Sequence, residues 1–120
     1  MSRTRSDIRL SVGMDDGGVT EIEWEADDAP EPGVQEAKAM LLSLWDAKAR
    51  NALRIDLWTP ALTVDDMNDF VFQTLSSLAD TYRRATNDDD LMLEIKTFAR
   101  RFAERASAKG QRAGGGGGPV

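Results

Sequence analysis

The sequence of 120 residues contains neither cysteine nor histidine. Without cysteine the chain can form no disulfide, and without either residue type it offers none of the Cys and His ligands of the usual structural zinc sites. The same absences exclude a cysteine nucleophile, a Ser-His-Asp triad and imidazole acid–base catalysis near neutral pH. Only carboxylate, lysine, arginine, tyrosine and hydroxyl groups remain for catalysis.

Long apolar runs are lacking as well. No stretch reaches the roughly 18 consecutive apolar residues that are typical of a membrane-spanning helix, and no apolar signal-peptide core follows the opening residues MSRTRSD. The net charge of −6 disfavours nucleic acid and anionic lipid as partners. We therefore expect a cytoplasmic protein with no membrane insertion and no nucleic-acid partner.

Three short segments alternate apolar and polar residues, which is the pattern of half-buried strands. The first two, 8–14 and 19–26, are separated by Asp and Gly residues at 15–18, and this arrangement predicts an antiparallel hairpin. The third strand is predicted at Leu53–Thr59, where Pro60 follows. Together they predict a small three-stranded sheet with one apolar face.

Three further segments show the 3.6-residue spacing of amphipathic helices. The predicted helices run from Gln35 to about Arg50, from a Thr63 cap to about Ala85, and from the segment 87–90 to about Ala108. The order β-β-α-β-α-α predicts one α+β domain over residues 1–109, with the helices packed on the apolar face of the sheet. The Gly-rich segment 110–120 is predicted to be a disordered tail.

Carboxylates form a row on the second predicted strand, because Glu21, Glu23 and Glu25 are two residues apart and share one face. Such a row could bind a hard cation, although a solvated sheet face is the simpler interpretation. A carboxylate-based metal-binding or hydrolytic small domain would combine Glu21 and Glu23 with Arg54 and Asp56. We keep it as the alternative, and expect no catalytic residue, no metal ligand and no cofactor.

Arg54, Asp56 and Trp58 alternate on one face of the third predicted strand, opposite its apolar face. They include no nucleophile and no tuned base, which argues against catalysis. Tryptophan and arginine dominate the hot spots of protein–protein contacts. We therefore predict that these three residues bind a protein partner; the other interpretation of Trp58 is packing inside the protein. Trp24 and Trp45 are predicted to lie in the core.

Charge is distributed unevenly along the chain. Residues 1–31 hold nine acidic and three basic residues, whereas 96–112 hold six basic and one acidic. A small sheet also leaves edge strands to be covered. Both features favour a homodimer, although two solvated faces are the simpler interpretation of the charge distribution.

Five segments in a fixed order carry a family resemblance: IEWEA at 22–26, AKAMLLSLWD at 37–46, NALRIDLWT at 51–59, QTLSSLADTYRRAT at 73–86 and KTFARRF at 96–102. Their order and spacing, from about Asp7 to Ala106, resemble the gliding motility-associated protein C (GldC) family. The Pro-rich linker and the Gly-rich tail depart from that pattern. The resemblance implies an accessory protein of bacterial surface gliding without assigned enzymatic activity. We expect a non-enzymatic protein that binds a protein partner, such as another component of the gliding machinery.

Overall fold

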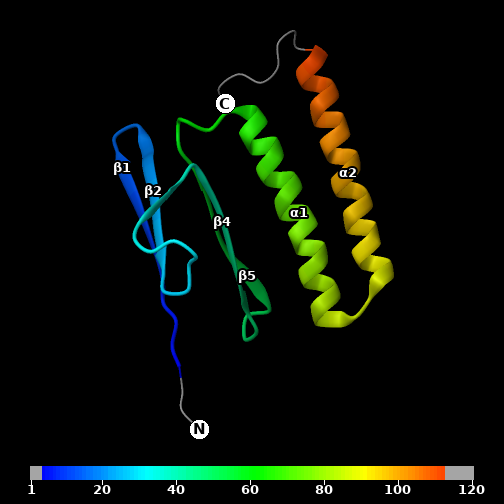
Figure 1. The fold of residues 1–120 in the computed structure, drawn as a ribbon, viewed down its shortest axis with the longest axis horizontal. Coiled ribbons are helices and arrows are strands. Elements are labelled where there is room, and N and C mark those ends of the chain that lie inside the picture. The colour runs from blue at the N-terminus through cyan, green and yellow to red at the C-terminus, as the bar shows by residue number, and fades with distance from the viewer. Residues whose placement is uncertain (1–3, 113–120) are drawn as a thin grey trace. The chain divides into compact units, whose positions relative to one another are not determined.

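The computed structural model of the protein describes residues 4–112 and has the α+β architecture that the sequence predicts (Figure 1). Within these residues, five strands are followed by two helices. The chain divides into two compact units, Met1–Leu62 with the strands and Thr63–Val120 with the helices. The expectations of a single domain and of helices that cover the sheet stay predictions.

The predicted hairpin and a three-stranded sheet are confirmed. The sheet is antiparallel, has the order β1-β2-β3, and consists of β1 (Ile8–Asp15), β2 (Gly18–Ala26) and β3 (Gln35–Ala37). Ile22 of β2 lies in the middle of this sheet, opposite Val12 of β1 and Ala37 of β3. Its side chain is only 1% exposed, so Ile22 is the centre of the core of this unit.

Two glycines shape the hairpin. Gly18 closes the turn with a φ of 113°, a conformation that residues with side chains rarely adopt. At Gly13 a bulge shifts the register between β1 and β2, and a Cβ atom there would lie 2.7 Å from Cγ of Glu21. Both positions therefore favour glycine over any other residue.

The predicted helix at 35–50 is wrong. Its residues form β3, β4 (Ala39–Asp46) and a turn, and β4 pairs with β5 (Asn51–Trp58) in a separate two-stranded antiparallel sheet. The predicted strand near Leu53–Thr59 therefore exists, but in the second sheet. The apolar run in β4 fits both the helical and the strand period, and β5 provides an adjacent partner of equal length.

The two later helices are confirmed as α1 (Val64–Thr86) and α2 (Asp89–Arg112). At the start of α1 the predicted cap is present: the Asp66 amide donates to Oγ1 of Thr63 at 3.0 Å, and the Thr63 amide donates to the Asp66 carboxylate at 3.2 Å. Asn87 ends the helix in the left-handed conformation, with a φ of 63°, and donates its amide to the Arg83 carbonyl.

The two helices pack side by side (Figure 1). Ala79 of α1 and Ala99 of α2 are 0% and 1% exposed. Nζ of Lys96 donates to Oγ of Ser76 at 2.9 Å and pairs with Oδ1 of Asp80 at 3.1 Å, which links α2 to α1 beside these alanines. In the described part of the chain, neither helix is long and apolar enough to span a membrane.

The end of α2 reaches three residues into the segment predicted as a tail, because the helix continues to Arg112. The rest of that predicted tail, 113–120, lies outside the described residues.

Candidate functional site

The β4–β5 ribbon presents one entirely aliphatic stretch of surface. Residues paired across an antiparallel ladder share a face, so the pairs Met40–Leu57, Leu42–Ile55 and Leu44–Leu53 lie together. We call these six side chains the aliphatic face. Leu44 is 58% exposed and Leu53 is 56% exposed. A two-stranded ribbon with so much exposed apolar surface is only marginally stable by itself. Burying this surface against another strand or a helix would increase its stability.

The opposite side of the ribbon carries the predicted contact residues. Its cross-strand pairs are Ala39–Trp58, Leu41–Asp56, Ser43–Arg54 and Trp45–Ala52, and we call this surface the tryptophan face. Trp45 is 65% exposed and Trp58 is 50% exposed. Two half-exposed indoles on one small ribbon form the composition that protein contact hot spots favour.

The structure brings Arg54, Asp56 and Trp58 together on β5, as alternate residues of one strand face. Nη2 of Arg54 lies 3.8 Å from Oδ2 of Asp56, and the two side chains are 64% and 43% exposed. Such an exposed and long ion pair contributes little to stability and leaves both groups accessible. The sequence placed these residues in one sheet with the acidic row; that placement is wrong, because β5 belongs to the second sheet.

Trp45 is an exposed aromatic residue of this face that sequence reasoning missed. It was predicted to lie in the core because its spacing matched a helical apolar stripe, but in β4 it projects from the tryptophan face and is largely exposed. Trp24, on the apolar face of the first sheet, is partly buried. The signal that could have found Trp45 is the length match between the run 39–46 and the neighbouring strand, which favours a hairpin over a helix.

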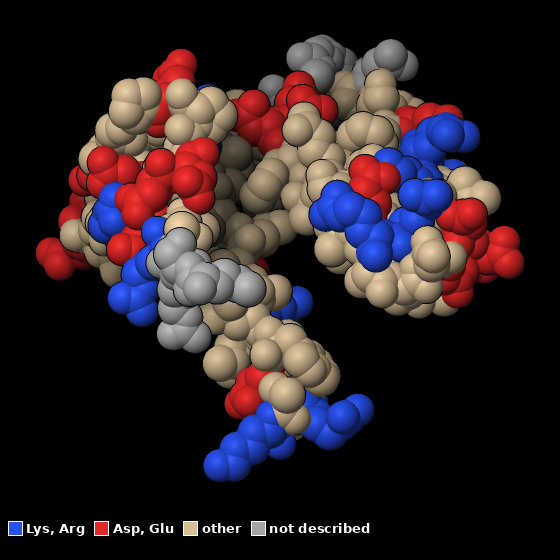
Figure 2. Space-filling model, turned by 60° about the horizontal axis from the view of Figure 1, so that its bottom comes forward, with Lys and Arg blue, Asp and Glu red and all other residues tan. Residues whose placement is uncertain are grey.

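Acidic side chains gather on the other sheet. Glu21, Glu23 and Glu25 share one face of β2, as predicted from their spacing, and Glu36 of β3 lies directly opposite Glu23. Figure 2 shows this acidic character over the part formed by β1 and β2, while the helices carry both signs. Like charges in opposite positions destabilise a sheet slightly, so this face favours solvent or cations.

Arg9 neutralises part of the negative charge at the Glu25 end of the acidic row. Arg9 lies 3.2 Å from the carboxylates of both Asp27 and Glu25. The hydrogen bonds to Asp27 and then to Glu25 raise the pKa of Arg9 above its ordinary value. The pKa of Asp27 is lowered, first because the Asp7 amide donates to it at 3.0 Å and second because Arg9 does.

The Asp27 carboxyl is therefore expected to titrate below ordinary aspartates. Because its folded-state pKa is lowered, its contribution to stability is present above the unfolded-state pKa and is lost as the pH falls through the folded-state value. Substituting Arg9→Met should raise the pKa of Asp27. NMR titration of the Asp27 side-chain carboxyl measures this change. The variant Lys48→Met removes a positive charge in the β4–β5 turn and should leave the titration midpoint of Asp27 in place. An Asp27 midpoint unchanged by Arg9→Met would contradict the assignment.

The residues of the alternative metal or hydrolytic site lie on two different sheets. Glu21 and Glu23 lie on β2 of the first sheet, whereas Arg54 and Asp56 lie on β5 of the second. Among residues 4–112, no group of three or more acidic side chains is arranged to hold a metal ion.

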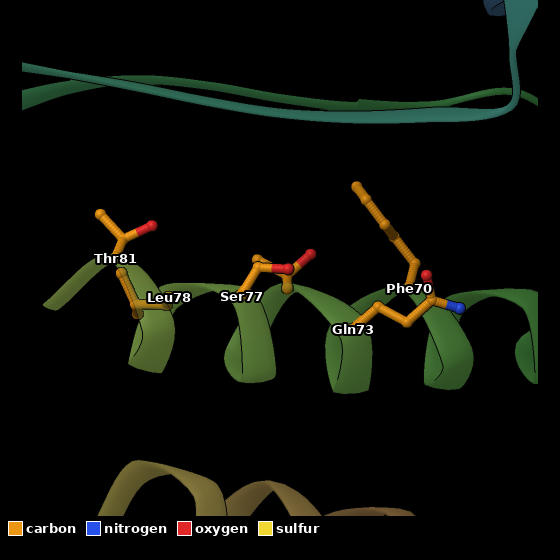
Figure 3. A pocket seen from close by; sticks show the side chains of 6 residues that line it. Phe70, Gln73, Ser77, Leu78 and Thr81 are labelled. Atoms are coloured by element: carbon orange, nitrogen blue, oxygen red, sulfur yellow. The ribbon is translucent and has the colours of Figure 1, made fainter. Parts of the chain in front are cut away.

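A shallow, open hollow lies on α1, lined by Phe70, Gln73, Thr74, Ser77, Leu78 and Thr81. Figure 3 shows that these side chains all come from this one helix, and that α2 runs on its opposite side. A comparable hollow on α2 includes Leu93, Phe98 and Arg101. Each of these hollows is lined by residues of one helix only.

Comparison with known proteins places the chain. The family model described as gliding motility-associated protein GldC-like matches residues 19–108, which include β3 to β5, α1 and most of β2 and α2. Neither curated proteins nor solved structures gave a match. The match spans three quarters of the sequence, and it includes the whole β4–β5 ribbon. This chain therefore belongs to the GldC-like family of gliding motility-associated proteins.

Proposed function

We propose that this protein is a non-enzymatic accessory factor of bacterial surface gliding, which acts by binding a protein partner through the tryptophan face of the β4–β5 ribbon. The observation that carries the proposal is the half-exposed position of Trp45 and Trp58 on either side of Arg54 and Asp56. Family membership supports the link to gliding. The proposal includes the cytoplasmic location expected from the sequence, and a partner from the gliding machinery.

The chemistry of the tryptophan face suits a protein surface as partner. The indoles offer large apolar area with little conformational entropy to lose, while Arg54 and Asp56 offer charges of both signs for orientation. Neither charge is buried, so binding would desolvate them only within the complex. A single anionic or cationic small ligand would leave one of these two charges unmatched.

Genetic complementation tests the proposal in the bacterium that encodes the chain. Deleting the gene should abolish or strongly reduce colony spreading, and the wild-type gene should restore it. Trp58→Ala should fail to restore spreading, and should reduce capture of the specific partner about tenfold or more, as hot-spot truncations do. Val34→Ala, at a 59% exposed site outside the ribbon, is the matched control and should behave as wild type.

Two outcomes would contradict the proposal. Normal spreading after deletion would remove the role in gliding. Full complementation by Trp58→Ala, with unchanged partner capture, would remove the tryptophan face as the contact surface.

A further inference from the structure

β5 is an edge strand of the two-stranded sheet. In the described part of the chain it is hydrogen bonded to β4 alone, and every one of its residues except Leu57 is exposed. It contains no proline, glycine or lysine, and its ladder with β4 runs without a bulge. Natural sheets usually protect such an edge with one of those devices or with charged side chains, or they cover it with another chain. The charges of β5, Arg54 and Asp56, have opposite signs and can therefore also pair with a second strand.

The sequence of β5 is self-complementary about Ile55. Reading outward from this residue, Arg54 and Asp56 are opposite charges at equal distances, and Leu53 and Leu57 are matching aliphatic residues. We propose that β5 pairs with β5 of a second copy, antiparallel about a two-fold axis at Ile55. Arg54 of each copy then lies opposite Asp56 of the other, which gives two intermolecular ion pairs.

The charges favour this register over its two neighbours. Moving the axis to Arg54 would place two arginines opposite each other, and moving it to Asp56 would place two aspartates together. Like charges in directly opposite positions destabilise a strand pair. Registers with the axis between residues would set the aliphatic face of one copy against the tryptophan face of the other. The axis at Ile55 avoids both conflicts.

The pairing extends both faces of the ribbon. It produces a four-stranded sheet in the order β4-β5-β5-β4, in which the two aliphatic faces become continuous. On the other side, Trp58 lies opposite Ala52 of the second copy, whose neighbour across the ladder is Trp45 of that copy. Dimerisation therefore groups indoles from both copies over a small residue. This inference rests on the proposed role of Arg54, Asp56 and Trp58 as contact residues, and it assigns them a first partner, the chain itself.

Charge exchange on the purified full chain tests the pairing. Sedimentation velocity over a dilution series should show a concentration-dependent dimer for the wild type. Arg54→Asp and Asp56→Arg each replace two attractive pairs by two repulsive pairs, so each should raise the dimer Kd roughly tenfold or more. The double variant Arg54→Asp/Asp56→Arg restores opposite charges and should dimerise within about threefold of wild type. Mixing the two single variants should give a heterodimer.

Matched controls separate this effect from net charge and folding. Lys48→Asp makes the same charge change as Arg54→Asp in the β4–β5 turn, and Asp16→Arg matches Asp56→Arg in the β1–β2 turn; both should dimerise as wild type. A wild type that stays monomeric throughout the series, or single variants that associate as tightly as wild type, would overturn the proposal. So would a folded double variant, or a mixture of single variants, that fails to associate. None of these results changes the outcome of the Trp58→Ala complementation, because each monomer keeps its tryptophan face.

Discussion

Ile22→Ala is expected to destabilise the strand unit by about 2–5 kcal/mol, the range for truncation of a fully buried isoleucine. Ile22 is 1% exposed and is the largest fully buried side chain described. It lies between Val12 and Ala37, so the deleted methyl and methylene groups would leave a cavity where all three strands of the first sheet meet. Urea unfolding followed by tryptophan fluorescence measures the effect, because all three tryptophans lie in Met1–Leu62.

Ile8→Ala provides the matched control. Ile8 has the same side chain and lies on the same apolar face of the sheet, opposite Ala26, but it is 71% exposed. Its truncation should cost about 0.5 kcal/mol or less, as at most surface sites. Equal losses of free energy of unfolding in the two variants would contradict the assignment of Ile22 as the centre of the core.

The elements that sequence reasoning located correctly are those with redundant local signals. In the first hairpin, strict alternation on both strands coincides with a turn of Asp and Gly residues at 15–18, and the two signals imply the same pairing. At α1 the Thr63 cap and the Asn87 stop bracket a long apolar stripe, so both ends follow from local chemistry. Agreement between local signals and the final fold made these predictions reliable.

The segment 35–50 lacked that redundancy. Ala37, Met40, Leu41, Leu44 and Trp45 fit a helical stripe, and alanine, leucine and methionine favour helices intrinsically. The same run also places Met40, Leu42 and Leu44 on one strand face. Long-range pairing decided between the two: the regular alternation in β5 needs a hydrogen-bonded neighbour, and β4 precedes it by one short turn. The periodicity of the segment 35–50 alone could not show that it pairs with β5.

The residues of the candidate site show the same difference between local and long-range signals. Arg54, Asp56 and Trp58 were placed correctly on one strand face, because their alternation depends only on β5 itself. Trp45 was lost with the predicted helix, because its exposure follows from the register of β4 against β5. The pairing of β5 with a second copy could in principle be read from the pattern Leu-Arg-Ile-Asp-Leu. The pattern predicts pairing with a second copy only when β5 lies at the edge of its sheet, and that position follows from the structure.

Ala79→Leu is expected to destabilise the helical unit by about 1–3 kcal/mol, the usual cost of overpacking. Ala79 is 0% exposed on the side of α1 that packs on α2, close to the Ser76 and Asp80 side chains that hold Lys96. Three additional carbon atoms would push the helices apart and strain these contacts. The change should appear as an earlier loss of helical ellipticity during urea unfolding, since both helices lie in Thr63–Val120.

Ala85→Leu is the control on the same helix, at an exposed position where leucine should alter stability by only a few tenths of a kcal/mol, about the difference in helix propensity. If Ala79→Leu were equally neutral, the close packing of α1 on α2 would be contradicted. The same two probes also test the single-domain prediction. Where the units unfold cooperatively, Ala79→Leu shifts the fluorescence and ellipticity transitions together; where they unfold independently, it shifts ellipticity alone and leaves the fluorescence transition of the strand unit in place.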